Sequence, residues 1–131
     1  MTSLPWTALV TLLAVLLMFA TGFNVGLARG RYKIMAPAVT GHELFERAYR
    51  VQMNTLEQAV IFLPVLWLYA GLIGDIGAGA MGLVWLLGRA WYAIAYQKNP
   101  AKRGPGFGIA MLAFIGLALG ALWGVGRVIL S

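Results

Sequence analysis

The sequence contains no cysteine and a single histidine, His42. Disulfides and thiolate metal sites are therefore excluded, and any thiol chemistry must be brought by a ligand. His42 stands alone in the connection that follows the first apolar run, without a cluster of other metal-ligating residues there, so we interpret it as a surface residue and expect no bound metal.

Acidic residues are also scarce, with four Asp and Glu against ten Lys and Arg, and the sequence pI is about 10.2. A basic protein can bind nucleic acid through a polar, positively charged face. Here the basic residues stand at the ends of apolar runs and leave no such face, so we expect no nucleic-acid partner.

Hydrophobic residues make up 61% of the 131 residues, and the mean hydropathy is +0.82, which is too apolar for a water-soluble chain of this length. Four segments approach the roughly 20 apolar residues that cross a bilayer. They span residues 4–28, 44–73, 79–96 and 106–130. We expect an all-α integral membrane four-helix bundle, formed by one domain over residues 1–131.

The connections between these segments are short, which predicts an up-down topology with antiparallel neighbours. Six Lys and Arg residues lie in the first and third connections and none in the second. By the positive-inside bias, loops 1 and 3 are cytoplasmic and both termini lie on the opposite side. The first apolar run has no basic residue before it and no small-residue cleavage site, so we interpret it as a retained helix.

Glycines recur every fourth residue in the two outer segments, at Gly22, Gly26 and Gly30 and again at Gly116, Gly120 and Gly124. Such ridges let helices approach closely in lipid. The ridges fit packing within one subunit and packing between subunits equally well.

A polar stripe marks the second segment, where Arg47, Arg50, Asn54 and Glu57 fall within about 80° of a helix face. An Arg or Asp at the centre of a membrane helix costs about 2.5 to 3.5 kcal/mol on insertion scales. The stripe should therefore face protein, water or a polar ligand. The alternatives are a structural ion-pair network of Arg50 and Glu57 that fixes helix packing, or a lower stripe that lies at the level of the lipid headgroups. Gln52 points to the opposite side of this helix.

The third segment offers a matching face, because Arg89, Tyr92 and Tyr96 follow an i, i+3, i+7 spacing. Arg103 stands between Pro100 and the Gly104-Pro105-Gly106 turn, near the start of the fourth segment. Guanidiniums suit carboxylates, Glu57 suits an ammonium, and amide and phenol groups suit a peptide. The inventory fits a small zwitterionic peptide, of which glutathione is the abundant thiol-bearing example.

The segment from Phe45 to Glu57 resembles the MAPEG family, the membrane-associated proteins in eicosanoid and glutathione metabolism. The later Arg89, Tyr92, Tyr96 and Arg103 match the spacing of its leukotriene C4 synthase and microsomal glutathione transferase branch. The resemblance implies a homotrimer that binds glutathione at each subunit interface. It implies that Arg103 stabilises the thiolate and that glutathione is held by Arg29, Arg50, Gln52, Asn54, Glu57, Tyr92 and Tyr96.

Two positions depart from the synthase branch. Gln58 stands where a Tyr usually follows the motif glutamate, and Arg29-Gly30-Arg31 replaces two successive arginines. In the non-catalytic branch of the family, the five-lipoxygenase-activating type, the position similar to Arg50 holds a Thr and the position similar to Glu57 holds an Asp. Because this chain keeps the charged pair, the catalytic branch is favoured.

We therefore expect a membrane-bound glutathione transferase that acts on lipophilic electrophiles arriving from the bilayer, with reduction of lipid hydroperoxides as a further activity. Glutathione is the co-substrate, and membrane lipid surrounds the homotrimer. Two other classes remain open. A non-catalytic lipid-binding scaffold would not need Arg103, and a small exporter of cations would need an unpaired acidic residue in the bundle.

Overall fold

Four long α-helices make up the protein in the computed structural model, which describes residues 3–131. They are α1 (Pro5–Tyr32), α2 (Glu43–Leu72), α3 (Asp75–Lys98) and α4 (Gly104–Leu130), with a 3-10 turn, η1 (Pro100–Lys102), before α4. Each of the four is long and apolar enough to cross a membrane. The prediction of an all-α chain with four such helices is confirmed. Residues 1 and 2 of the expected 1–131 domain lie outside the described part.

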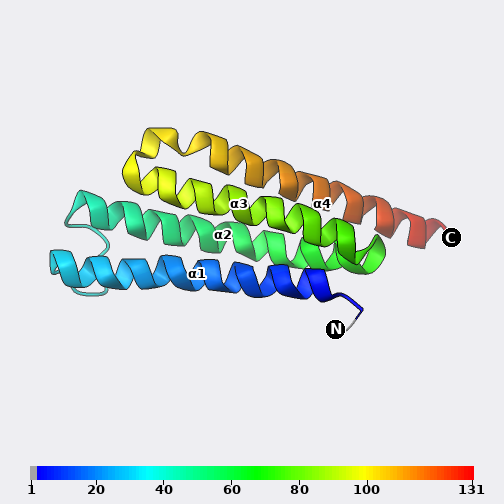
Figure 1. Ribbon diagram of the computed structural model, residues 1–131, viewed down its shortest axis with the longest axis horizontal. Coiled ribbons are helices and arrows are strands. Elements are labelled where there is room, and N and C mark those ends of the chain that lie inside the picture. Colours follow the sequence, from blue (N-terminus) through cyan, green and yellow to red (C-terminus); the bar gives the residue numbers. More distant parts are fainter. Residues whose placement is uncertain (1–2) are drawn as a thin grey trace.

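The helices lie side by side, and Figure 1 shows both termini at the end where α2 turns into α3. We call this the terminal end. The connection from α1 to α2 and the connection through η1 lie at the other end, which carries Arg29, Arg31, Lys33, Lys98, Lys102 and Arg103 and which we call the basic end.

At the basic end, α1 continues to Tyr32, four residues beyond the expected boundary at residue 28. Lys33 adopts a left-handed conformation (φ 56°), and its N–H group and that of Ile34 both bond the Arg29 carbonyl oxygen. This is a common way to end a helix. Arg29 and Arg31 are therefore helical residues of the last turn and do not belong to a loop.

At the terminal end, α3 begins at Asp75, four residues before the expected residue 79. The Asp75 carboxylate accepts the Thr7 N–H and the Thr7 hydroxyl, both at 2.8 Å, and the Trp6 N–H at 3.1 Å. The first N–H groups of a helix lack partners within it, and Leu4 supplies no side-chain cap. Asp75 caps α1 from another helix, which explains why it is held in α3 and not in the turn. The other boundaries shift less, with α3 ending at Lys98 instead of residue 96 and α4 beginning at Gly104 instead of 106.

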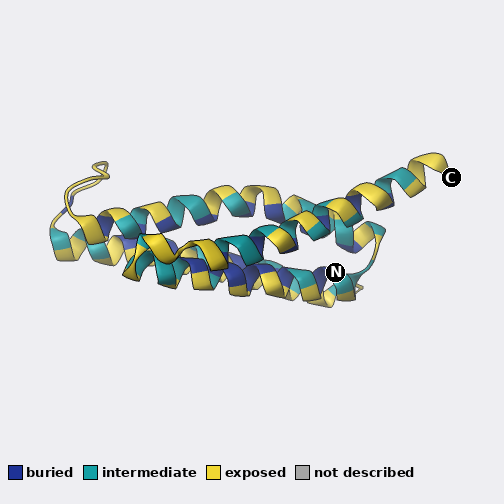
Figure 2. Ribbon diagram, turned by 90° about the horizontal axis from the view of Figure 1, so that it is seen from above, coloured by how far each residue is buried: buried dark blue, intermediate teal, exposed yellow. Residues whose placement is uncertain are grey.

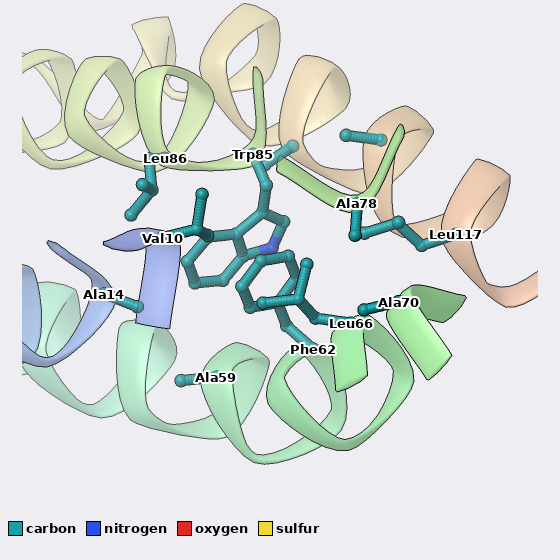
Figure 3. Close-up of a cluster of buried hydrophobic side chains, with 12 residues drawn as sticks. Val10, Ala14, Ala59, Phe62, Leu66, Ala70, Ala78, Trp85, Leu86 and Leu117 are labelled. Carbon is teal, nitrogen blue, oxygen red and sulfur yellow. The ribbon is translucent and has the colours of Figure 1, made fainter. Parts of the chain in front are cut away.

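The core centres on Phe62 of α2 and Trp85 of α3, whose rings stack with centroids 3.8 Å apart (Figure 3). Val10, Leu66 and Leu117 surround this pair, and alanines allow the helices to approach it. Figure 2 shows buried residues turned toward the bundle axis and exposed ones along the outer faces. The outer faces carry many large apolar side chains, including Leu12, Phe19 and Leu119, which suits contact with lipid.

The two glycine ridges have different surroundings. A side chain added at Gly120 or Gly124 would meet Tyr69 or Leu72 of α2, so this ridge packs within the subunit. At Gly26 and Gly30 of α1 nothing among the described residues lies within 4 Å of an added Cβ. Gly22 of the α1 ridge packs against Gln52 of α2, whereas Gly26 and Gly30 are open to a second molecule, and the α4 ridge is used within the subunit.

Candidate functional site

The polar stripe of α2 faces outward. Arg50 and Glu57 are exposed and Asn54 is half-buried. Across residues 3–131 neither Arg50 nor Glu57 forms an ion pair, and the single ion pair found there joins Glu43 to Arg47. The alternative of a structural ion-pair network thus lacks its partners within one subunit, and both charges remain available to a ligand.

Arg47 has a different role from its neighbours in the stripe. Its Nη1 donates to the carbonyl oxygens of Gln97 and Lys98 at 3.0 and 3.1 Å. These carbonyls belong to the last turn of α3, where the helix leaves acceptors unpaired. Arg47 therefore caps the C-terminal end of α3 and connects it to α2 at the basic end.

Arg89 of α3 is fully buried, with 1% of its surface exposed. Its Nη2 donates to Asn54 Oδ1 at 2.8 Å and to Thr55 Oγ1 at 3.0 Å, and the guanidinium lies 4.3 Å from the centroid of the Tyr92 ring. Its Nε has no partner among the described groups. A buried cation is costly unless its donors are satisfied, so Arg89 fixes the carbonyl of Asn54 and leaves the NH₂ group of that amide free to donate.

Arg103 connects η1 to α4. The Asn99 side chain accepts the Ala101 N–H at 3.1 Å and starts the turn, and Arg103 Nη1 donates to the Pro100 carbonyl oxygen at 3.1 Å. The side chain is otherwise exposed. Since α4 starts at the next residue, the guanidinium lies beside the positive end of a long helix dipole.

A small cavity of about 150 Å³ joins these elements. It is lined by Asn54 of α2, Tyr92 of α3, and Arg103, Gly104 and Phe107 around the start of α4. Three residues predicted separately, on three different helices or their ends, therefore meet at one place. Tyr96 lies next to it, with its ring centroid 5.6 Å from that of Tyr92.

Two glycines bring α3 and α4 together beneath this cavity. A Cβ added at Gly106 would lie 2.5 Å from the Tyr92 backbone nitrogen, and one at Gly88 would lie 2.7 Å from the Ala110 nitrogen. Real Cβ atoms do not approach so closely, so only glycine permits this contact. The contact places the start of α4, and with it Arg103, beside Tyr92.

Arg29 and Gln52 do not line the cavity. Arg29 Nη1 donates to the Ala38 carbonyl oxygen at 2.8 Å and lies 5.0 Å from the centroid of Phe45, so it supports the first loop. Gln52 lies against Gly22 of α1. Because residues two apart on a helix differ by about 200°, Gln52 and Asn54 face opposite sides of α2.

Gly104, Phe107 and Thr55 were not predicted from the sequence as site residues. Gly104 belongs to the stiff turn after Arg103, so its place in the site could have been predicted from that turn. Phe107 follows Arg103 by one helical turn, but an aromatic residue in an apolar helix carries no signal of its own. Across the described chain no three His, Asp or Glu residues gather as metal ligands.

Comparison with known proteins connects this arrangement to a family. The chain is 49% identical to an uncharacterised protein of Synechocystis over 121 residues, covering 92% of this chain and 88% of the relative. It is 41% identical to human microsomal glutathione S-transferase 2, covering 76% and 68%, and 38% identical to bovine leukotriene C4 synthase, covering 88% and 77%.

The family model described as the MAPEG family matches residues 7–123, which include α2, α3 and η1 and most of α1 and α4. The match therefore covers every residue of the cavity and the whole polar stripe. With four helices able to span a bilayer, the protein is an integral, multi-pass membrane protein, and the chain belongs to the MAPEG family.

Proposed function

We propose that the protein is a membrane-bound glutathione transferase that joins the glutathione sulfur to lipophilic electrophiles. The observation that carries the proposal is the cavity where Asn54, Tyr92 and Arg103 meet beside the unpaired charges of α2. Two relatives named above, a glutathione S-transferase and leukotriene C4 synthase, support the same reading.

The free groups of the site match the peptide. Arg50 can bind a glutathione carboxylate, and Glu57, three residues beyond Asn54, can bind the ammonium group. The NH₂ group of Asn54 can donate to a peptide carbonyl, because Arg89 holds its other atom. The phenols of Tyr92 and Tyr96 supply further hydrogen bonds.

Arg103 acts on the sulfur. A thiol has a pKa near 8.5 in water, and a guanidinium in a partly desolvated site can lower it by about two units. The proton passes to water, and the thiolate lone pair then forms a carbon–sulfur bond. The leaving group departs with its bonding electrons, or an epoxide oxygen keeps them and takes a proton from water. Arg103 thus stabilises charge and does not itself remove the proton.

The complete site requires more than one subunit in this proposal. Arg29, Gln52 and the open glycines Gly26 and Gly30 lie on the α1 side of the molecule, away from the cavity. In a homotrimer of up-down bundles, the α1 side of one subunit would meet the stripe of the next and add Arg29 and Gln52 to the bound peptide. An interface glutathione would also explain why Arg50 and Glu57 form no ion pair among residues 3–131.

The electrophile would enter from the bilayer, since the outer helix faces are apolar. Glutathione would enter from the cytoplasm through the basic end, with the termini on the opposite side. Lipid hydroperoxides are a second substrate class. The thiolate attacks the terminal peroxide oxygen, the O–O bond breaks, and the lipid leaves as an alkoxide that takes a proton from water. A second glutathione thiol then displaces water from the resulting sulfenic acid and forms the disulfide.

The rival function is a non-catalytic lipid-binding scaffold. The two are separated by titrating glutathione into the purified protein while recording thiolate absorbance near neutral pH, and then adding a chromogenic aryl halide. A transferase gives a saturable thiolate signal and conjugate formation. Binding without thiolate and without turnover toward any electrophile or hydroperoxide would assign the scaffold function instead.

A further inference from the structure

A second hollow lies between α1 and α3 and shares no lining residue with the cavity at Arg103. It is an apolar groove of about 400 Å³, within the size range of ligand sites. Ala48 and Val51 of α2 form its floor, and Leu17, Ala20, Ala93 and Ile94 form much of its walls. We call it the α1–α3 groove.

The groove continues into a polar mouth at the basic end. A neighbouring hollow of about 270 Å³ shares Asn24, Ala48 and Gln97 with the groove and adds Arg31 and Tyr32. Lys98, the last residue of α3, lines the groove itself. The mouth therefore carries two exposed cations, and neither forms an ion pair among residues 3–131.

Asn24 is the second unusual feature. It lies inside the membrane-spanning helix α1, it is exposed into both hollows, and its amide has no hydrogen-bond partner in the described part of the chain. An unsatisfied amide in hydrocarbon is costly, so a polar group should meet it there. Seven residues separate Asn24 from Arg31, which places it about 10 Å deeper along α1.

These distances match the layers of a phospholipid. The interfacial region on each side of the hydrocarbon is about 5 to 8 Å thick, and an arginine side chain extends outward from its helix position. Arg31 and Lys98 then lie at the level of the phosphate, and Asn24 lies where the ester carbonyls enter the hydrocarbon. An acyl chain can follow the apolar walls below.

We propose that the α1–α3 groove is a binding site for one anionic phospholipid. Its phosphate is bound by Arg31 and Lys98, one ester carbonyl accepts the Asn24 amide, and one acyl chain fills the groove. Two unpaired cations with no acidic residue among the lining groups favour an anionic headgroup over a zwitterionic one. The site is independent of the proposed chemistry at Arg103.

The test measures lipid binding to the detergent-purified full chain by native mass spectrometry, with phosphatidylglycerol and phosphatidylcholine of the same acyl chains. Each cation near an anionic surface is worth about a fivefold change in affinity. Arg31→Ala and Lys98→Ala should each weaken phosphatidylglycerol about fivefold and leave phosphatidylcholine nearly unchanged. Lys33→Ala and Lys102→Ala, exposed cations of the same end outside the groove, are the matched controls and should change neither lipid.

Asn24→Leu tests the ester contact separately. It should weaken both lipids by the same factor, about threefold to tenfold, and preserve their ratio, because the ester is common to both. A diether phosphatidylglycerol lacks the ester carbonyls. It should bind the wild type more weakly than the ester lipid does, whereas Asn24→Leu should bind the diether and the ester lipid with the same affinity. Ala93→Trp should exclude every lipid by filling the groove, with circular dichroism confirming that the helices persist.

Several results would overturn the proposal. Equal affinity for phosphatidylglycerol and phosphatidylcholine would contradict an anionic headgroup site. If Lys33→Ala weakened phosphatidylglycerol as much as Arg31→Ala or Lys98→Ala, the preference would come from the general surface charge and not from the groove. Saturable binding of glycerol phosphate with the same affinity would identify a soluble anion as the ligand. Unchanged lipid binding in Ala93→Trp would show that the lipid lies elsewhere. A second copy of the chain found to cover the groove would also contradict a lipid there.

Discussion

The two ends of the bundle differ in how their polar groups are satisfied. At the terminal end Asp75 uses both carboxylate oxygens on Trp6 and Thr7, and Thr11 accepts the indole N–H of Trp67 at 3.0 Å. In the stripe of α2, which runs from near the basic end to the middle of the helix, Arg50 and Glu57 are exposed without ion-pair partners in the described chain. At the basic end itself, the side chain of Arg103 donates only to the Pro100 carbonyl oxygen among the described groups. Asp75 and Thr11 of the terminal end thus have their partners within the subunit, whereas Arg50 and Glu57 have no ion-pair partner among the described residues.

This difference separates a structural role from a binding role. A membrane helix tolerates a charged group where another group meets it, and a group met from within the same subunit stabilises the fold. A group left open marks a ligand, lipid or subunit contact. Substitutions at the two ends should therefore affect different measurements, and each prediction below tests that separation.

The largest expected effect is the all-or-none difference in sidedness between the two ends. A reporter fused within residues 33–42 or at Lys102 should lie in the cytoplasm, and a reporter after Ser131 should lie on the opposite side, because loops rich in cations are retained in the cytoplasm. Paired cytoplasmic and non-cytoplasmic reporters at each position provide the control. A cytoplasmic Ser131 would reverse the orientation and deny cytosolic glutathione access to the basic end.

The next effect concerns Arg103. If the guanidinium lowers the thiol pKa by about two units, from about 8.5 to 6.5, Arg103→Ala should lower the thiolate fraction at pH 7 about 25-fold. Turnover should fall less, by about threefold to fourfold, since a more basic thiolate is a better nucleophile and offsets part of the loss. Part of the lost rate should return as the pH rises, and Arg103→Lys should rescue incompletely because an ammonium lacks the planar fork.

The measurement is a pH profile of aryl halide conjugation together with glutathione affinity, which should fall only modestly in Arg103→Ala. Arg127→Ala is the matched control at the terminal end, where the guanidinium lies 4.6 Å from the Trp123 ring centroid. Full turnover of Arg103→Ala at pH 7 would show that Arg103 does not stabilise the thiolate.

A separate effect, on glutathione binding and not on the thiolate, is expected for the open charges of α2. Arg50→Ala or Glu57→Ala should weaken glutathione binding at least tenfold, since losing one partner of a desolvated, charge-assisted contact typically costs about 2 to 5 kcal/mol. Gln58→Ala, one residue further along α2, is the control and should change the affinity much less. Calorimetry on the detergent-solubilised protein measures both, and an unchanged affinity in both charge variants would make the stripe structural.

A smaller effect still is expected for Arg89, which positions Asn54 without lining the cavity. Arg89→Met should weaken glutathione binding about threefold to fivefold by freeing the Asn54 amide, with little change in the affinity for lipid. Thr55→Val removes the other hydrogen bond of Arg89 and leaves Asn54 held, so its glutathione affinity should match wild type. Equal losses in the two variants would attribute the effect to general packing.

The local features of this protein were predictable from the sequence, and the long-range ones were not. Apolar runs reveal the four helices, and the spacing of Arg50, Asn54 and Glu57 reveals one helix face, because both depend on neighbours within a few turns. The start of α3 was missed because Asp75 bonds a segment 68 residues away.

The site shows the same division. The meeting of Tyr92 with Arg103 depends on the close approach of Gly88 to α4 and of Gly106 to α3, whereas the sequence drew attention to the more regular glycine ridges. Arg29 was assigned to glutathione through the family resemblance, and its bond to the Ala38 carbonyl depends on a loop conformation that no periodicity encodes.

The smallest expected effect on activity comes from Asp75, and it completes the comparison of the two ends. Asp75→Ala removes three hydrogen bonds that cap α1, and the loss of a helix cap typically costs about 0.5 to 2 kcal/mol. The midpoint of thermal unfolding in detergent should fall by several degrees, while glutathione affinity and turnover of the folded protein stay at the wild-type level. Asp75→Asn, which keeps one acceptor oxygen, should lose less stability, and Thr7→Val should lose only the hydroxyl bond. If Asp75→Ala instead reduced glutathione affinity as strongly as Glu57→Ala, the two ends would be coupled through α3, and the separation of structural from binding polar groups would not hold for this protein.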